Sequence, residues 1–261
     1  MPSTPHPDDV ALATALVRDA VDLAARMRAD GLDVDRKTSV SDLVTSADHA
    51  AEELVVGRLR AERPDDGLLA EEGSHHDGTS GRRWVIDPVD GTYNFAHGSD
   101  HWCSAIALVE DDDVVRGAVA HHATGRVLVG GPDLPTTCDG DPVERLADRP
   151  VAELGAATYL HPSAIDVAQV REPFLRAARL PATLRMLGSG SMDLVGVTTG
   201  MVGCWFQHST PPWDWWPGSA LVRGAGGEAR RLDVEGLTWS VAGPPGAATA
   251  LAAALAGAPH D

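Results

Sequence analysis

The segment WVIDPVDGTYNF, residues 84–95, constrains this chain more than any other stretch. An apolar run typical of a buried β-strand ends at Asp87, Asp90 follows three positions later, and Gly91–Thr92 opens a predicted helix. Two carboxylates at the end of a buried strand cost several kcal/mol of desolvation each unless they are paired or bind a metal. The chain must therefore bring a cation to this point, unless the segment is only an Asx-type turn that caps a helix.

The residue types around this segment favour one kind of cation. Ligands that are all oxygen indicate a hard ion such as Mg²⁺. The turn at Gly91–Thr92 would leave backbone N–H groups unpaired at the start of a helix, where a phosphate group binds well. The segment therefore predicts a metal site beside a phosphate site.

Acidic residues occur at three more places where the chain changes structure. Glu71–Glu72 follows a short apolar strand, Asp214 lies among three tryptophans, and Asp48 ends DLVTSAD at the start of a predicted helix. Each has a simpler interpretation alone: a solvated loop for the glutamates and a helix N-cap for either aspartate. Taken together, their order along the chain favours a shared site.

The acidic composition limits the possible partners. The 261 residues include 21 Lys and Arg against 38 Asp and Glu, a net charge of −17, with 43% hydrophobic residues. Such a chain folds, but it lacks the basic surface that nucleic acids or anionic membranes require. Three cysteines without a CxxC motif favour reduced thiols. No apolar run approaches the ~20 residues of a membrane span, and the start shows no signal peptide, so we expect a cytoplasmic protein.

Periodicity predicts an α+β protein in two halves, residues 1–149 and 150–261. The first half has helices over about 8–30 and 46–63 with an extended segment over 37–45 between them, short strands ending at 71 and 87, and a β-meander over 104–129. In the second half strands and helices alternate. The predicted strands are 156–160, 183–186, 204–207 and 228–232, and the predicted helices are 164–178, 191–199 and 216–224. The tail from Gly243 is either a final strand with a short helix or a frayed end.

These motifs resemble those of the inositol monophosphatase family of metal-dependent phosphatases. The resemblance extends from about residue 37 to residue 227. It rests on Lys37 with DLVTSAD, LLAEEG at 68–73, WVIDPVDGTYNF, GSGSMDL at 188–194, and PWD at 212–214 with AGG at 225–227. It implies a layered α/β/α/β/α sandwich of the inositol monophosphatase and fructose-1,6-bisphosphatase type, and usually a homodimer.

The resemblance also implies a metal centre. Glu71, Asp87 and the Val89 carbonyl would hold one Mg²⁺, and Asp87, Asp90 and Asp214 a second. Two divalent cations would neutralise these acids and attract an anionic substrate, which the net charge cannot do. Lithium would inhibit by displacing one magnesium ion.

The family's catalytic residues have counterparts here. Thr92, hydrogen-bonded to Asp48, would orient and help deprotonate the attacking water, and Gly91 and Thr92 would donate backbone N–H groups to the phosphate. Glu72 would assist from the outer shell or with a third, weakly held ion. Water would attack phosphorus directly. A phospho-aspartate route is disfavoured because the aspartates of DPVDGT are separated by two residues, and the nucleophile motif of haloacid-dehalogenase-type phosphatases, DxDGT, has one.

The resemblance also implies substrate contacts from Asp90, the segment Gly188–Ser189–Gly190 and Gln207. The segment at 188–191 has a simpler interpretation as a helix N-cap. Position 207 departs from the family pattern, because inositol-hydrolysing members carry a glutamate there. An amide both donates and accepts hydrogen bonds, whereas a carboxylate only accepts. Trp215 and Trp216 replace small residues and are either core residues or an apolar wall beside the substrate.

The predicted activity is therefore Mg²⁺-dependent hydrolysis of a small phosphate monoester. Inositol 1-phosphate or a related sugar or polyol phosphate is the first choice. Histidinol phosphate and 3′-phosphoadenosine 5′-phosphate are alternatives from the same family. A protein associated with RNA or transcription is the non-enzymatic alternative, and the net charge of −17 disfavours it.

Overall fold

The computed structural model describes residues 7–37 and 43–258. Its helices are α1 (Pro7–Asp30), α2 (Ser46–Glu62), α3 (Thr92–Ala96), α4 (Ala168–Ala178), α5 (Gly190–Thr198), α6 (Pro212–Gly224) and α7 (Pro245–Leu255). The strands of the first half are β1 (Val34–Arg36), β2 (Leu43–Thr45), β3 (Gly67–Ala70), β4 (His75–His76), β5 (Arg82–Asp90), β6 (Cys103–Glu110), β7 (Asp113–His121), β8 (Arg126–Gly131), β9 (Leu134–Cys138) and β10 (Asp141–Pro142). Those of the second half are β11 (Gly155–Thr158), β12 (Thr183–Arg185), β13 (Cys204–His208), β14 (Glu228–Val234) and β15 (Leu237–Gly243).

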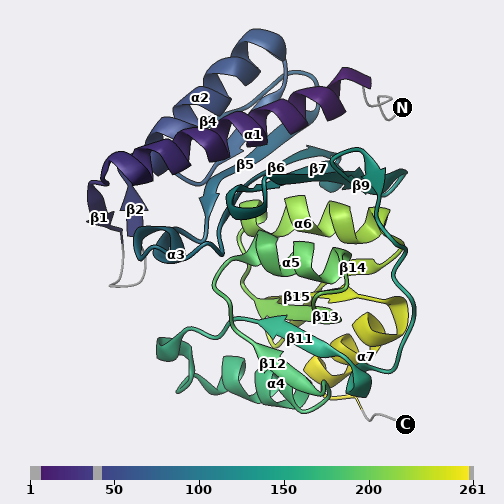
Figure 1. Cartoon of the computed structure of the whole chain (residues 1–261). Helices are drawn as coiled ribbons and strands as arrows, with labels where there is room; N and C mark the ends of the chain where they lie inside the picture. Colours follow the sequence, from purple (N-terminus) through teal and green to yellow (C-terminus); the bar gives the residue numbers. More distant parts are fainter. Residues whose placement is uncertain (1–6, 38–42, 259–261) are drawn as a thin grey trace.

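The molecule is built in five layers (Figure 1). Helices α1 and α2 cover the outer face of the first large sheet, α5 and α6 lie between the two large sheets, and α4 and α7 cover the outer face of the second. This confirms the predicted α+β class and the α/β/α/β/α order of layers. None of the described helices is both long and apolar enough to cross a membrane.

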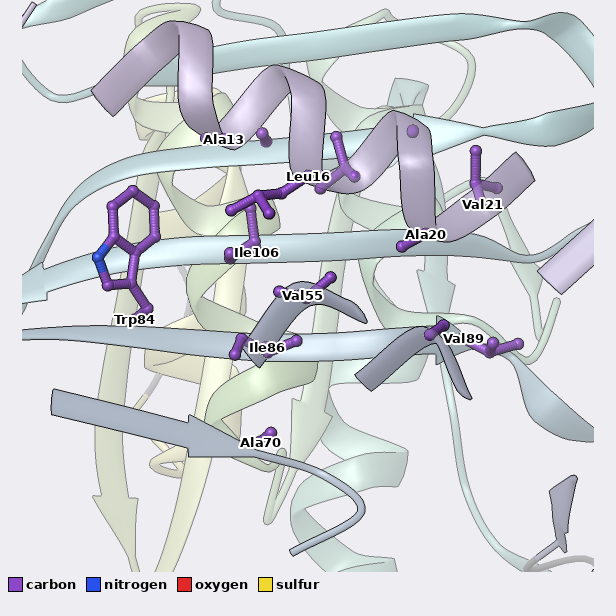
Figure 2. Packing of buried hydrophobic residues seen from close by; sticks show 14 of the residues in the cluster. Ala13, Leu16, Ala20, Val21, Val55, Ala70, Trp84, Ile86, Val89 and Ile106 are labelled. Atoms are coloured by element: carbon purple, nitrogen blue, oxygen red, sulfur yellow. The ribbon is translucent and has the colours of Figure 1, made fainter. Parts of the chain in front are cut away.

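The first large sheet places the strand that carries Asp87 near one edge. Its order is β10-β9-β8-β7-β6-β5-β3-β4, in which β3 and β5 run parallel and the other neighbours are antiparallel. Leu16 of α1 and Val55 of α2 pack on Trp84, Ile86 and other buried side chains of the sheet (Figure 2). The apolar faces of both helices therefore fix β5 from one side, and this makes β5 a rigid support for the site.

The second large sheet has the order β12-β11-β13-β15-β14. Its core contains Phe206, Trp239 and the alanine-rich helix α7. The chain passes from one sheet to the other between residues 143 and 154, and the predicted boundary at 149/150 falls in this segment. The described part of the tail from Gly243 is the last residue of β15 followed by helix α7, so the frayed-end alternative is wrong there, and the final strand lies before the predicted tail.

Several predicted boundaries shift in the structure. Helix α6 begins at Pro212 and not at Trp216, because proline is well tolerated in the first turn of a helix. Helix α4 begins at Ala168 after a short 3₁₀ turn, and β5 continues through Pro88 to Asp90. Strands β1, β4, β9 and β10 were not predicted, nor was β15 apart from its last residue, Gly243. Of the extended segment predicted over 37–45, residues 38–42 lie outside the described residues.

The tryptophans after Asp214 are packing residues. Trp215 is fully buried and stacks on Trp205 with ring centroids 5.8 Å apart, and Trp216 is partly buried in the same layer. The guanidinium of Arg231 lies over both rings, 5.4 and 5.3 Å from their centroids. The core interpretation of Trp215 and Trp216 is therefore confirmed, and neither lines the cavity described below.

Candidate metal centre and active site

A β-bulge in β5 brings Asp87 and Asp90 to the same side of the sheet. Three steps along β5 from Asp87 to Asp90 correspond to two steps along β6, from Ala105 to Cys103. Residues three apart in a regular strand point to opposite faces, but the extra residue of a bulge restores the same face. Pro88 is tolerated within the strand because a bulge position needs no N–H donor. The DPVD spacing thus places two carboxylates next to each other at the end of the strand.

Two other segments bring acids to this pair. Strand β3 is parallel to β5 with Ala70 opposite Ile86, so Glu71 emerges beside Asp87. Asp214 arrives from the first turn of α6. One carboxylate oxygen from each of Asp87, Asp90 and Asp214 lies within 4.8 Å of the others. Acids from distant parts of the chain therefore converge, as the sequence predicted.

The cluster is buried and electrostatically unfavourable as it stands. Asp87 is 1% exposed, and its Oδ1 has no hydrogen-bond partner among the described residues. Burial, followed by repulsion from neighbouring carboxylates, raises the pKa of Asp87 and of Asp214 well above the usual range. An orphaned, buried carboxylate oxygen among like charges is the arrangement that a hard divalent cation satisfies.

Asp90 also joins the two halves of the molecule. Its Oδ1 accepts from the backbone N–H of Gly190 at 3.1 Å, and its Oδ2 accepts from that of Ser191. Burial raises the pKa of Asp90, while these N–H donors oppose the shift. A carboxylate at the start of α5 is also favoured by the helix dipole. The N-terminus of α5 is thereby fixed beside the acidic cluster.

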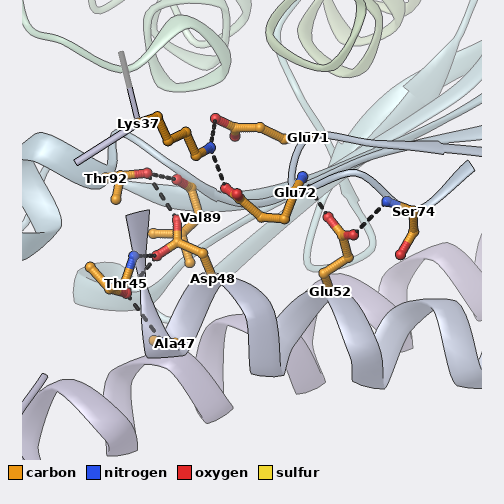
Figure 3. Close-up of polar contacts among 10 residues, drawn as sticks. All are labelled: Lys37, Thr45, Ala47, Asp48, Glu52, Glu71, Glu72, Ser74, Val89 and Thr92. Carbon is orange, nitrogen blue, oxygen red and sulfur yellow. Dashed lines mark hydrogen bonds and ion pairs between the residues drawn. The ribbon is translucent and has the colours of Figure 1, made fainter. Parts of the chain in front are cut away.

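Thr92 and Asp48 form a second polar unit (Figure 3). Asp48 is fully buried at the start of α2, where its Oδ2 accepts from the backbone N–H and hydroxyl of Thr45 in a capping box. The Thr92 hydroxyl lies 3.0 Å from Asp48 Oδ1 and 3.0 Å from the Val89 carbonyl oxygen. A hydroxyl has one proton, so it donates to only one of these acceptors at a time. Thr45 is the N-cap, which corrects the N-cap alternative for Asp48.

A lysine lies beside the two glutamates (Figure 3). Lys37 Nζ is 3.1 Å from Glu71 Oε1 and 2.7 Å from Glu72 Oε1. Burial raises the pKa of Glu72 to about 7, although Lys37 opposes the shift. Burial alone would lower the pKa of Lys37, but the two carboxylates raise it overall. Glu71 is therefore partly neutralised by a side chain of the protein, whereas Asp87 is not.

Gly91 is required where β5 turns into α3. It has a φ of +93°, and a Cβ there would approach the His101 carbonyl oxygen and the Ser189 Cβ to 3.1 Å. As expected, the residue precedes a helix, α3, whose first backbone N–H groups have no partner within the helix. Gly91 and Thr92 both border the cavity above the carboxylates.

The predicted residues largely meet at one cavity of about 730 Å³. Those that line it are Glu71, Asp87, Asp90, Gly91, Thr92, Gly188, Ser189, Gly190, Gln207 and Asp214. Asp48, Glu72 and Val89 do not line it; they lie behind the lining residues, in contact with Thr92 or Lys37. Ser189 is also the N-cap of α5, so the N-cap interpretation of its segment is confirmed, and the substrate contact stays a prediction.

Sequence reasoning missed part of the lining. Tyr93, Tyr159, His161 and Asp193 also line the cavity. Burial raises the pKa of Asp193 to about 6, and its Oδ1 lies 3.7 Å from His101 Nε2, beyond hydrogen-bond distance. Tyr159 and His161 stand in a loop without a motif. Asp193 lies within the GSGSMDL segment, so that motif could have identified it.

Comparisons with known proteins agree with this geometry. The sequence model of the inositol monophosphatase family matches residues 7–260. A histidinol-phosphatase of Mycobacterium tuberculosis is 35% identical over 97% of this chain and 95% of its own length. An inositol-1-monophosphatase of Mycobacterium leprae is 32% identical over 87% and 82%. The solved structure of Mycobacterium tuberculosis SuhB superposes with a TM-score of 0.78 at 28% identity, covering 97% of both chains.

Proposed function

Because the chain belongs to the inositol monophosphatase family and is a hydrolase of phosphate monoesters, we propose that its reaction depends on Mg²⁺ bound at the acidic cluster. The observation that carries this proposal is the buried trio Asp87, Asp90 and Asp214, with oxygens within 4.8 Å of one another and one oxygen of Asp87 left unpartnered. Buried acids in this arrangement need a cation, and hard oxygen ligands select magnesium over softer metals.

Two magnesium ions would share Asp87. Glu71, Asp87 and the Val89 carbonyl oxygen would hold one, and Asp87, Asp90 and Asp214 the other. When bound, such ions lower the pKa of a coordinated water and stabilise the leaving oxygen. A third, weakly held ion would bind near Glu72 and would have to compete with Lys37, whose Nζ is 2.7 Å from Glu72 Oε1.

The residues of the chain then act on the water and the phosphate. With its proton donated to Asp48, the Thr92 hydroxyl oxygen accepts a hydrogen bond from the attacking water and orients it toward phosphorus. Backbone N–H groups of Gly91 and Thr92 would bind phosphate oxygens at the start of α3. Because Asp48 is buried and tied to Thr45, Thr92 is held in a fixed position relative to β5.

The leaving group would occupy the wall formed by Gly188, Ser189, Gly190 and Gln207. This wall presents hydroxyl and amide groups, which suit a polyol, so inositol 1-phosphate or a related sugar phosphate is the first candidate. As a neutral amide, Gln207 leaves this wall less acidic than the family's glutamate would.

A second candidate, histidinol phosphate, is favoured by two observations. The aromatic side chains of Tyr93, Tyr159 and His161 line the cavity, where a flat ring could stack on them. The Mycobacterium tuberculosis relative that matches nearly the whole chain is named a histidinol-phosphatase.

The remaining expectations carry over from the family as proposals. We expect millimolar lithium to inhibit, a homodimer in solution, and a cytoplasmic location. The proposed partners are the small phosphorylated substrate and the second subunit, with no nucleic acid or membrane. The net charge of −17 supports the exclusion of RNA.

Phosphate release tests the proposal directly. The protein is stripped of metal, then supplied with Mg²⁺ and a panel of inositol, sugar, histidinol and nucleotide monophosphates. We expect turnover that needs Mg²⁺ and is abolished by a chelator. Equal turnover with and without Mg²⁺ would refute the metal assignment, and the ranking of the panel would decide between the two candidate substrates.

A further inference from the structure

Helix α2 carries a second buried acid one turn beyond Asp48. Glu52 is four residues further on, so the two side chains project from the same face of the helix. Glu52 is 4% exposed and does not border the cavity. Its carboxylate instead accepts hydrogen bonds from two backbone N–H groups, those of Glu72 at 2.7 Å and Ser74 at 2.9 Å (Figure 3).

Those two N–H groups belong to the turn that follows β3. The turn is closed by a bond from the Ala70 N–H to the Ser74 carbonyl oxygen at 2.9 Å, and Gly73 adopts a φ of +109°. Glu71, at the start of the turn, donates its own N–H to the Ile86 carbonyl oxygen at 3.2 Å. Glu71 is therefore held to β5 on one side and, through its neighbour, to α2 on the other.

We propose that Glu52 is a positioning residue that fixes the direction of Glu71 toward Asp87 and so sets the affinity of the centre for magnesium. The inference rests on the proposed metal site. A buried carboxylate that accepts two N–H bonds is a strong, directional restraint, since charge-assisted hydrogen bonds are about twice as strong as neutral ones. Without it, the 70–74 turn keeps only its backbone bonds, and Glu71 gains freedom that metal binding must then remove.

Helix α2 thus supports the site at two points. Asp48 orients Thr92 at the end of β5, and Glu52 orients the turn after β3. Because both acids are on one rigid helix packed against the sheet, the spacing between the Thr92 hydroxyl and Glu71 is fixed by a single element. Partners that orient metal ligands in this way typically change metal affinity 10–100-fold when they are mutated.

Two substitutions separate position from charge. Glu52→Asp keeps the negative charge but shortens the side chain by one methylene, so it cannot reach both N–H groups. Glu52→Gln keeps the length but removes the charge and replaces one accepting oxygen by a donor. Glu53 is exposed on the same helix, so Glu53→Asp and Glu53→Gln are matched controls.

The experiment is Mg²⁺ titration of metal-free protein by calorimetry, with the half-saturating Mg²⁺ concentration and kcat measured in parallel. For Glu52→Asp we expect Mg²⁺ binding weaker by roughly 10–100-fold, with kcat at saturating Mg²⁺ changed far less. Both Glu53 variants should match the wild type. If Glu52→Asp binds Mg²⁺ as tightly as the wild type while Glu52→Gln does not, the effect is one of charge and the inference is wrong.

Amide hydrogen exchange gives an independent decision if Glu52→Asp fails to fold. A positional effect of Glu52→Gln loosens the Glu72 and Ser74 N–H groups, which then exchange faster than in the wild type, whereas a through-space charge effect leaves their exchange unchanged. Weaker Mg²⁺ binding with unchanged exchange of these two amides would overturn the inference. A wild-type protein that neither binds Mg²⁺ nor needs it would instead refute the proposed function, so the two failures are distinguishable.

Discussion

Buried acids lie at both ends of β5, but only those at the start of the strand are paired with a cation of the protein. At the start of the strand, Arg82 lies between Asp9 and Asp66, with nitrogen–oxygen distances of 3.0 and 2.9 Å. Asp66 also accepts from the Trp84 indole N–H at 2.9 Å. At the other end, Asp87 has an oxygen without a partner among the described residues, and its nearest charged neighbours are other acids.

The contrast teaches how to separate structural acids from functional ones. Each aspartate near Arg82 is neutralised by a cation that the chain itself supplies, so its burial requires no bound metal ion. The acids at Asp87 and Asp90 are buried to the same degree, and burial raises their pKa values with no neighbouring cation among the described residues to oppose the shift. Burial alone therefore carries no functional information; burial without a counter-charge does.

The largest effect on activity is expected at the end of β5 that carries Asp87. Asp87→Asn removes the ligand that both proposed metal ions share, so phosphate release should fall by about a thousandfold, or ~4 kcal/mol in transition-state stabilisation. Calorimetric Mg²⁺ affinity should fall with it. The exposed Asp77→Asn is the control and should behave as wild type. Unchanged turnover in Asp87→Asn would show that Asp87 is not a ligand.

The next effect separates the two ends by stability in the absence of metal. Asp66→Asn leaves the partly buried Arg82 guanidinium with Asp9 as its remaining carboxylate partner, so the free energy of unfolding should drop by about 2 kcal/mol. Asp87→Asn removes a repelling charge and should instead raise it, by on the order of 1 kcal/mol. Urea unfolding of the metal-free proteins measures both. If both substitutions changed the free energy of unfolding in the same direction, the proposed difference between the two ends of β5 would be wrong.

The sequence allowed the acidic end to be predicted because its signals are local. Asp87, Asp90 and Gly91 stand within five residues, and Glu71 directly follows an apolar strand. Glu52, by contrast, contacts a turn 20 residues away, and nothing in its helix distinguishes it from Glu53. The partnership of Arg82 with Asp9 spans more than 70 residues and was likewise invisible. Contacts of this kind depend on how helices pack on the sheet, which periodicity alone does not specify.

Local signals also misled where proline was involved. Pro88 indicated the end of a strand, yet the bulge accommodates it and β5 continues to Asp90. The predicted helix began at Trp216, after Pro211 and Pro212, yet α6 starts at Pro212. Both errors concern the position of an element's end by three or four residues. They matter at this site because Asp90 and Asp214 stand at those two ends.

A third effect is the pH dependence of the metal-free protein. Burial raises the folded-state pKa of Asp193 to about 6 and of Glu72 to about 7, and that of Asp87 rises as well. The folded protein therefore holds protons that the unfolded chain releases, so stability is greatest below about pH 4 for these groups and falls as pH rises toward about 7. Thermal melts at a series of pH values should show that the melting temperature of Asp87→Asn falls less steeply with rising pH than that of the wild type. Identical slopes would mean that Asp87 keeps an ordinary pKa.

The smallest effect tests whether the residue at position 207, on the cavity beside the acids of β5, contacts the substrate. Gln207→Glu places another carboxylate on the cavity, where the proposed leaving group lies. A carboxylate accepts hydrogen bonds from a ring hydroxyl more strongly than a neutral amide does, by about 1 kcal/mol, so the kcat/KM ratio of inositol 1-phosphate to a simple aryl phosphate should rise about fivefold.

Comparing two substrates on one variant makes this test independent of any loss of metal. An added acid near the cluster can change Mg²⁺ affinity, but that change affects both substrates equally and cancels in the ratio. The same ratio for histidinol phosphate should move less if its ring stacks on Tyr159, because stacking does not involve position 207. A ratio that does not move for any substrate would place Gln207 outside the contact surface and confine the functional acids to the end of β5.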